Sequence, residues 1–232
     1  MPNWCSSSIT FYSTNKEQIK RLHKDFKTIY DGEPTQENGF GHGWMGDYAN
    51  HYYKEIGAIN INCRGSVAEI EDVTQMKKDG TTYHYFQMST STAWSSKVEL
   101  WAHIIKDNYE DVDIAFVAEE CGNEVYEKFD PDNFFYYSEQ YVVNTSYPKK
   151  DKDGKIYFEW ESFYAGSLND IHDFFHEASL PFLYQEFDTI EKMKQYLESR
   201  FKTYTHDGND DEGFVSIYTY CQYDPFKGDF RQ

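Results

Sequence analysis

The sequence predicts an α+β fold in two parts, the first of order β-α-β-β-α-β and the second of order β-β-α-α-β. Apolar and polar residues alternate at period two in several short segments, which is typical of strands. Other segments repeat apolar residues at helical spacing, and some of them begin with a capping signal. The chain has 232 residues, of which 19% are aromatic, so it contains enough apolar surface for a substantial core.

The first strand and the first helix follow from a clear pattern. Ile9 and Phe11 alternate with polar residues, so we expect a strand here. Thr14 and Glu17 form the capping box T-x-x-E, and Gly32 suits the end of the helix that this box begins. The apolar residues of the helix recur at Ile19, Leu22, Phe26 and Ile29.

Three more strands and a second helix complete the first part. Residues 58–62 form a short candidate strand, residues 83–89 a longer one, and residues 112–118 alternate into a third. Ser96 and Glu99 form a second capping box. The helix after this box has inward positions at Val98, Trp101, Ile104 and Ile105. This order is that of the ferredoxin-like plan, an antiparallel sheet with two helices on one face.

The second part is predicted as a C-terminal β-β-α-α-β extension. Its expected elements are strands 140–147 and 156–163, helices 168–179 and 189–201, and strand 215–221. Lys150–Gly154 is a hairpin signal, and Asp188 suits the start of the second helix. No Pro/Ser-rich linker divides the chain. We therefore expect a ferredoxin-like domain over 1–125 and an acidic α+β subdomain over 126–232 that packs against it.

The charge of the chain is strongly negative, with 22 basic against 40 acidic side chains and a net of −18. Residues 1–110 carry a net of −3 and residues 111–232 a net of −15. Phosphate contacts need a positive surface, so a general nucleic-acid binder is disfavoured. No apolar run approaches the ~20 residues of a membrane span, and no secretion signal is seen, so we expect a cytoplasmic protein. The acidic half serves either solubility or docking on a basic partner.

The four cysteines are far apart in the sequence and contain no CxxC pair. They are Cys5, Cys63, Cys121 and Cys221. This spacing supports neither a zinc ribbon nor a thioredoxin-like site, so we expect free thiols and no cofactor.

Three segments carry a resemblance to a known family. The opening Met1–Cys5, the turn Thr90–Ser95 and the acid-x-Gly ending within Glu119–Gly122 resemble the YubB-type ferredoxin-like domain family. That family is found mainly on plasmids and phages and has no assigned function. The resemblance implies the ferredoxin-like plan and an origin on a mobile element. The chain departs from the family pattern at Ser7, where Asn is usual, and at Glu55–Asn60, where a Trp-Gly-Thr-Lys-Trp type segment is usual.

Two motifs have the form of ligand sites. Gly41–Gly46 reads G-x-G-x-x-G, but it lies in a polar loop predicted over 33–50, with no strand before it and no helical stripe after it. We therefore favour a loop over a dinucleotide site. His172 and His176 flank Asp173 at helical spacing and could hold zinc, but an obvious third ligand is missing. Histidines at the edge of a buried stripe are the favoured interpretation.

The acidic segments do not form catalytic or calcium motifs. Two acidic segments offer many oxygen ligands, one with Asp151 and Asp153 and the other the run Asp207–Gly213. Neither segment has the residue pattern of an EF-hand loop. Glu119 and Glu120 lie on opposite faces if the strand continues, so they cannot act together on one substrate. With no nucleophile elbow either, we expect no enzyme activity.

A basic stripe on the first helix gives an alternative function. Its members are Lys16, Lys20, Lys24 and Lys27, with Arg21 beside them. Together with the sheet aromatics Tyr12, Tyr83 and Tyr85, they could form a single-stranded nucleic-acid-binding module. The helix and the open sheet face lie on opposite sides in such folds, so direct nucleic-acid binding is the second choice.

The favoured function is that of a non-enzymatic mobile-element protein that docks on a host nucleic-acid-handling protein. A counter-defence role, as an anti-restriction or anti-CRISPR inhibitor, suits the acidic charge and the family resemblance. The expected partner is a basic host protein, and no membrane is involved. The residues expected to contact it are Glu119, Glu120, Glu159, Glu161, Asp207, Asp210, Asp211 and Glu212.

Overall fold

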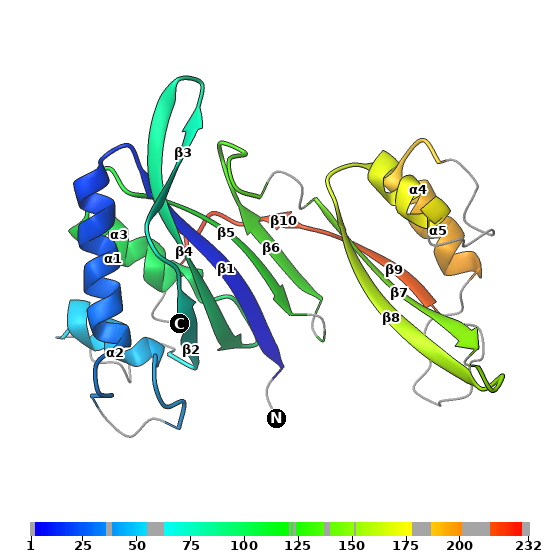
Figure 1. Cartoon of the computed structure of the whole chain (residues 1–232), viewed down its shortest axis with the longest axis horizontal. Helices are drawn as coiled ribbons and strands as arrows, with labels where there is room; N and C mark the ends of the chain where they lie inside the picture. Colours follow the sequence, from blue (N-terminus) through cyan, green and yellow to red (C-terminus); the bar gives the residue numbers. More distant parts are fainter. Residues whose placement is uncertain are drawn as a thin grey trace. The chain divides into compact units, whose positions relative to one another are not determined.

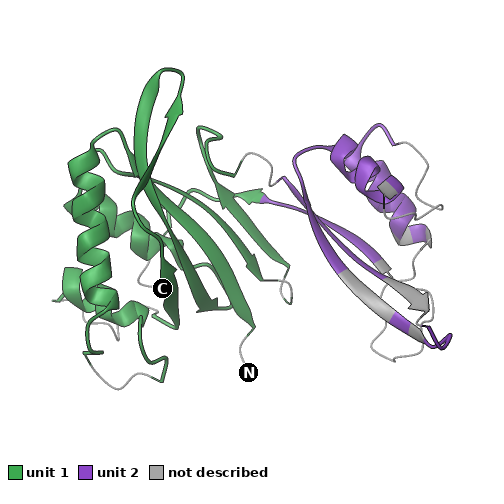
Figure 2. Cartoon of the chain, in the orientation of Figure 1, with its two compact units in different colours: residues 1–136, 221–232 green, residues 137–220 purple. Residues whose placement is uncertain are grey.

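Helices and antiparallel strands make up the computed structural model, so the predicted α+β class is confirmed. The structure describes residues 3–35, 39–54, 63–120, 122, 124–136, 140–150, 152–177, 187–200 and 214–228. They belong to two compact units (Figure 2), the first of residues 1–136 with 221–232 and the second of residues 137–220. Within the described residues, no helix has the length and apolar character needed to cross a membrane.

The first unit is built on one twisted sheet. Its strands are β1 (Trp4–Ser13), β2 (Gly65–Ile70), β3 (Thr74–Lys78), β4 (Thr81–Ala93), β5 (Asp113–Glu120), β6 (Val125–Phe129) and β10 (Cys221–Gln222). The strand order is β10-β6-β5-β1-β4-β2, and β3 also pairs with β4 (Figure 1). The pairs are antiparallel except that between β10 and β6, which is parallel.

Three helices share a core with one face of this sheet. They are α1 (Lys16–Tyr30), α2 (Met45–Tyr52) and α3 (Val98–Asn108). Phe26 of α1 lies at the centre, with its ring 5.4 Å from that of Phe11 and 5.6 Å from that of Trp101. The predicted inward positions of α1 and α3 are confirmed, since Ile19, Leu22 and Phe26 and then Val98, Trp101, Ile104 and Ile105 are buried. Aromatic rings therefore supply much of the core.

Both predicted capping boxes are wrong. Asn15, not Thr14, precedes α1, and its carboxamide oxygen accepts hydrogen bonds from the amides of Glu17 and Gln18. Asn15 has extended backbone angles, which place this short acceptor over the free amides of the first turn. Lys97 precedes α3 in a left-handed conformation, so Ser96 does not cap that helix.

The region between α1 and β4 differs from the expected loop and strand. The predicted loop over 33–50 contains most of α2, whose buried Met45, Tyr48 and Ala49 recur at helical spacing. Strands β2 and β3 form a part of the sheet at 65–78 that the sequence analysis did not predict. The strand predicted at 58–62 lies outside the described residues.

Part of the other face of the sheet is covered by residues 130–136, which we call the strap. Tyr12 is only 2% exposed, and its ring lies 5.1 Å from that of Phe135. The hydroxyl of Tyr136 is 2.9 Å from the Thr10 hydroxyl and 3.1 Å from the Ser8 hydroxyl. Both faces of β1 are therefore buried along its second half, whereas Trp4 and Ser6 at its start are exposed.

A single carboxylate shapes the strap. Asp130 is buried and accepts hydrogen bonds from the backbone amides of Phe134, Phe135 and Tyr136 at 3.0, 2.9 and 2.8 Å. The ammonium group of Lys128 in β6, itself buried, donates to the carbonyl of Tyr136. These bonds hold the aromatic side chains of the strap against the sheet.

The second unit has its own sheet, core and helices. The strands β7 (Tyr141–Lys150), β8 (Ile156–Ala165) and β9 (Phe214–Thr219) pair in the antiparallel order β8-β7-β9, and the helices are α4 (Leu168–Glu177) and α5 (Ile190–Arg200). The predicted hairpin and both helices are confirmed. Thr189 takes the place expected for Asp188 at the start of α5, because its hydroxyl accepts from the Lys192 amide. Asp188 instead pairs with the Lys192 ammonium group at 2.7 Å.

The division of the chain differs from the predicted boundary at residue 125. Strand β6 pairs with β5, and β10 pairs with β6, so the segments on both sides of the second unit belong to the first. Within the second unit, the Tyr220 amide donates to the Gln140 carbonyl at 3.1 Å, so its two ends lie side by side. Residues 137–220 therefore form an insertion in the first unit.

The structural units also divide the charge differently from the two sequence halves. The first unit carries 14 basic and 24 acidic side chains, and the second carries 8 and 16. The net charges are −10 and −8, so neither unit is near neutral. The excess acid belongs to the whole chain and not to one part of it.

Candidate partner-binding surface

Two tryptophans stand exposed where β1 begins and β4 ends. Trp4 is 48% exposed and Trp94 is 46% exposed. The pairing of β1 with β4 places Trp4 opposite Ala93, and the Trp94 amide donates to the Asn3 carbonyl at 2.9 Å. Trp side chains are enriched among the hot-spot residues of protein interfaces.

Each indole is held by a neighbour that comes from another segment. The Phe40 ring lies edge-on to Trp4 with 6.2 Å between centroids. The guanidinium carbon of Arg64 lies 4.3 Å from the centre of the Trp94 ring, close enough for a cation–π contact. We call Trp4, Phe40, Arg64 and Trp94 the tryptophan edge.

The turn that carries Trp94 has a strained backbone. Trp94 has φ 65° and Lys97 has φ 54°, values that side chains other than glycine rarely adopt. The Thr92 hydroxyl donates to the Ser95 carbonyl at 2.6 Å, and the Ala93 amide donates to the Arg64 carbonyl at 2.8 Å. Such strain persists where surrounding contacts hold it, and it is concentrated at functional sites.

A partly buried carboxyl group supports the same turn. The Ser96 hydroxyl donates to the Glu127 carboxyl group of β6 at 2.6 Å. Burial raises the pKa of Glu127, while the bond from Ser96 acts in the opposite direction. Cys5 lies under this end of the sheet, and burial raises the pKa of its thiol to about 12. The thiol is therefore protonated at neutral pH and does not act as a nucleophile.

Acidic side chains of the β5–β6 turn lie beside the tryptophan edge. Glu119 pairs with Ser6 of β1, and Glu124 is exposed four residues after β5 ends. A side chain at Gly122 would collide with Asn3, so the turn lies close to the start of β1. Glu119, predicted to contact a partner, is half-buried here.

Glu120 does not fit the predicted surface. It is only 3% exposed, and its carboxylate accepts from the Gly122 amide at 2.7 Å. Because side chains alternate along a strand, Glu120 faces the helices and Glu119 the other side. Its carboxylate shapes the turn and is not presented to a partner.

The other predicted partner-binding residues belong to the second unit. Glu161 is half-buried in β8. The Glu159 side chain and residues Asp207, Asp210, Asp211 and Glu212 lie outside the described part of the structure. Glu119 belongs to the first unit and Glu161 to the second.

The glycine motif has a packing role in the structure. Gly41 and Gly43 have φ of 72° and 73°, and the Gly43 carbonyl accepts from Val67 of β2 at 2.8 Å. A Cβ atom at Gly43 would lie 2.5 Å from the Val67 carbonyl oxygen. Helix α2 begins at Met45 within the motif, and Trp44 before it supplies no side-chain cap. Close approach to β2 explains Gly43, whereas Gly41 is explained by its positive φ alone.

The histidine pair has a local explanation as well. The His172 ring accepts from the Phe187 amide at 3.3 Å and lies parallel to the Phe187 ring. Among the described side chains, no group of three His, Cys, Asp or Glu could hold a metal ion. The cysteines Cys5, Cys63 and Cys221 are free thiols, and Cys121 lies outside the described residues.

The aromatic face proposed for nucleic-acid stacking is occupied by the strap. Phe134 and Phe135 lie against Tyr12, and Phe135 also contacts Tyr85 with 5.1 Å between centroids. Phe134 lies 4.9 Å from Tyr83. Bases could stack here only after the strap had moved away.

No protein-family model matches the chain, and no curated protein or solved structure is significantly similar to it. The sequence shows two tryptophans 90 positions apart, and only the antiparallel pairing of β1 with β4 brings them together.

Proposed function

We propose that this chain is a non-enzymatic protein that binds a basic partner through the tryptophan edge and the acidic turn beside it. The observation that carries the proposal is the exposure of Trp4 and Trp94 at adjacent backbone positions, one of them on a strained and hydrogen-bonded turn. Trp and Arg are the residues most enriched among interface hot spots. The net charge of −18 would steer a basic partner toward this surface.

The proposed fold family is ferredoxin-like, with a mobile-element origin as in the YubB-type family. The order β5-β1-β4-β2, together with α1 and α3 as the helical connections, supports this assignment. Helix α2, strand β3 and the insertion at 137–220 are additions to that plan. The proposed location is the cytoplasm, where host nucleic-acid-handling proteins work.

The proposed biological role is counter-defence. Restriction and CRISPR effectors bind phosphate backbones through basic surfaces. An acidic protein with aromatic anchors would compete with nucleic acid for such a surface. Electrostatic attraction would set the association rate, and the tryptophans would slow dissociation.

The test is a binding assay between the purified chain and purified restriction and CRISPR effector complexes. We expect one effector to bind, with affinity falling steeply as salt is raised. Trp4→Ala and Trp94→Gly should weaken binding by about tenfold or more, the scale of one hot spot. Tyr157→Ala is the matched control, because Tyr157 is equally exposed but belongs to the second unit.

Two outcomes would contradict the proposal. One is binding that both tryptophan variants retain in full. The other is a gel shift of single-stranded nucleic acid by the chain at moderate salt, without any bound effector. The second outcome would favour the alternative function, in which Tyr12, Tyr83 and Tyr85 stack on bases with the lysine stripe of α1.

A further inference from the structure

A groove of about 780 Å³ lies between α1 and α2 in the first unit. Its volume falls in the range of sites for small organic ligands. The third wall is the segment after α1, at Gly32, Glu33 and Thr35. The titratable side chains that line it are Lys24, Asp25, Glu33, Asp47, His51 and Lys54.

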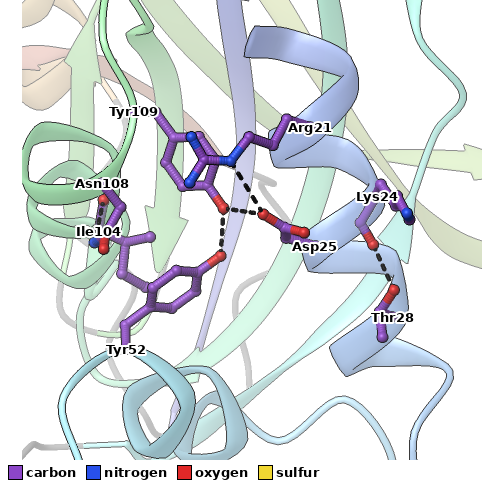
Figure 3. A network of polar contacts seen from close by, with 8 residues as sticks. All are labelled: Arg21, Lys24, Asp25, Thr28, Tyr52, Ile104, Asn108 and Tyr109. Atoms are coloured by element: carbon purple, nitrogen blue, oxygen red, sulfur yellow. Dashed lines mark hydrogen bonds and ion pairs between the residues drawn. The ribbon is translucent and has the colours of Figure 1, made fainter. Parts of the chain in front are cut away.

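Charges of both signs line this groove without neutralising one another. In the described part of the chain, neither Lys24 nor Lys54 makes an ion pair. Figure 3 shows the Lys24 ammonium group pointing away from the neighbouring Asp25. The two ammonium groups are therefore available to a ligand that enters the groove.

The Asp25 carboxylate is held in place from behind. The Tyr109 hydroxyl donates to it at 2.7 Å, and the Tyr52 hydroxyl lies 2.6 Å from that of Tyr109 (Figure 3). Since the Tyr109 hydroxyl uses its proton to donate to Asp25, it accepts the hydrogen bond from the Tyr52 hydroxyl. Burial raises the pKa of Tyr52 to about 12 and also raises that of Tyr109, so both remain donors at neutral pH.

Arg21 completes this support. Its guanidinium carbon lies 4.9 Å from the centre of the Tyr109 ring, and its Nε is 3.9 Å from the Asp25 carboxylate. One Asp25 oxygen is thus occupied by Tyr109 and Arg21. Within the described residues no contact occupies the second oxygen, so it can accept from a donor in the groove.

The opposite wall is fixed by a second carboxylate. Asp47 is 8% exposed and accepts from the amide and the hydroxyl of Thr35 at 3.0 and 2.6 Å. The Asn50 side chain donates to the same hydroxyl at 3.3 Å. These bonds tie the segment after α1 to α2, so the groove is already formed without a ligand.

We propose that this groove binds a small zwitterion of dipeptide size. The ligand's ammonium group would donate to Asp25, and its carboxylate would lie against Lys54 and His51. A purely anionic ligand would face Asp25, Glu33 and Asp47, and a purely cationic ligand would face Lys24 and Lys54. This site is independent of the tryptophan edge and adds a small-molecule ligand to the proposed function.

The test uses glycyl-leucine and two blocked forms of it, measured by NMR titration of the full chain. Because the two charges supply the recognition, any dipeptide that fits is a valid probe. Glycyl-leucine should shift the amide signals of α1 and α2 with a Kd of about 1 mM or below. N-acetylglycyl-leucine lacks the ammonium group and glycyl-leucinamide lacks the carboxylate, so each should bind at least about tenfold more weakly.

Two variants assign the charges to their residues. Asp25→Asn keeps an acceptor for Tyr109. This variant should no longer bind glycyl-leucine more tightly than N-acetylglycyl-leucine, which lacks the ammonium group. Lys54→Ala should no longer bind glycyl-leucine more tightly than glycyl-leucinamide, which lacks the carboxylate. Lys16→Ala is the control, since Lys16 starts α1 outside the groove and should leave all three affinities unchanged.

The proposal is overturned if glycyl-leucine at about 10 mM, well above a millimolar Kd, shifts no groove signal. It is also overturned if the blocked forms bind equally well, or if Asp25→Asn and Lys54→Ala bind as the unmodified chain does. Thermal unfolding of each variant shows whether it is folded, so a lost affinity cannot come from lost structure.

Discussion

At the scale of single residues, Trp94 combines an unfavourable backbone with an exposed indole. A left-handed conformation costs a side chain other than glycine roughly 1–2 kcal/mol. Trp94→Gly removes this strain, whereas Trp94→Ala keeps it. We expect the glycine variant to be more stable than the alanine variant by about 1 kcal/mol in urea unfolding, because only glycine adopts φ 65° freely.

Both variants lose the indole, so both should lose the partner equally. The comparison therefore distinguishes the effect of the indole on binding from the effect of the backbone conformation on stability. Equal stability of the two variants would show that the turn relaxes without glycine and would contradict the strain argument. If both variants bind the partner as the unmodified chain does, Trp94 is not part of the binding surface.

Glu127 gives a prediction with a pH dependence. Burial raises its pKa in the folded chain, so its stabilising contribution is complete below the unfolded pKa and is lost as pH rises through the folded pKa. Glu127→Gln keeps an acceptor for Ser96 but cannot ionise. The variant should therefore gain stability over the parent as pH rises above the unfolded pKa of Glu127, by less than about 1 kcal/mol because part of the carboxyl group meets solvent.

Thermal unfolding at a series of pH values measures this difference. Glu124→Gln is the matched control, since Glu124 is exposed and should show no such trend. A gain for Glu127→Gln that is constant with pH would contradict the assigned cause.

At the scale of elements, the strap is the feature that depends most on one side chain. Asp130→Asn replaces one of the two carboxylate oxygens with an NH₂ donor, so at least one of the three strap amides loses its acceptor and meets a second donor. Leaving buried amides without partners should cost about 1–3 kcal/mol in urea unfolding. Asp132→Asn is the control on the same segment, because its carboxylate is exposed and accepts one bond at 3.3 Å from Tyr12.

A cost for Asp130→Asn no larger than that for Asp132→Asn would mean that the strap is held by its aromatic contacts and not by its carboxylate. Increased exposure of Tyr12, measured by hydrogen exchange of β1, would accompany the expected loss.

Helices and strands whose apolar residues repeat at a regular spacing could be predicted from the sequence. Elements that are fixed by contacts between residues far apart in the sequence could not. The buried stripes of α1 and α3 repeat within one segment, so local spacing is enough to find them. The strap has aromatic residues without a period, and Tyr136 meets its partners Ser8 and Thr10 more than 120 positions away. Helix α2 was missed because its first turn contains a glycine and no capping side chain.

The candidate sites show the same limit. Trp4 and Trp94 are visible in the sequence, but only the register of β1 with β4 joins them. Asp25 and Tyr109 meet across 84 positions, and nothing local to either residue indicates the bond. The acidic residues were recognised from their number, yet exposure decides which of them can act, and Glu120 is buried.

At the scale of the whole molecule, the insertion predicts that the first unit folds without the second. The chain with residues 137–220 replaced by a short Gly/Ser linker should keep β10 beside β6 and unfold in one cooperative transition. The ends of the insertion are joined by the bond between Tyr220 and Gln140, so a short linker can span them. Circular dichroism with thermal unfolding measures the result.

A chain that ends at residue 136 is the control for this deletion. It lacks the ring of Phe226 against Phe129 and the bond from Tyr223 to Glu99, so it should be less stable than the linked chain. If the linked chain shows no cooperative transition, the first unit needs the insertion for its fold.

The insertion also sets the order in which the molecule is completed during synthesis. Residues 137–220 are synthesised before residues 221–228, and at about 5–20 residues per second this takes roughly 4 to 17 s. Throughout that time β6 is a sheet edge without its neighbour, and Phe129 lacks the ring of Phe226. The nascent first unit therefore keeps an open edge until the second unit, whose last strand β9 ends at Thr219, has been made.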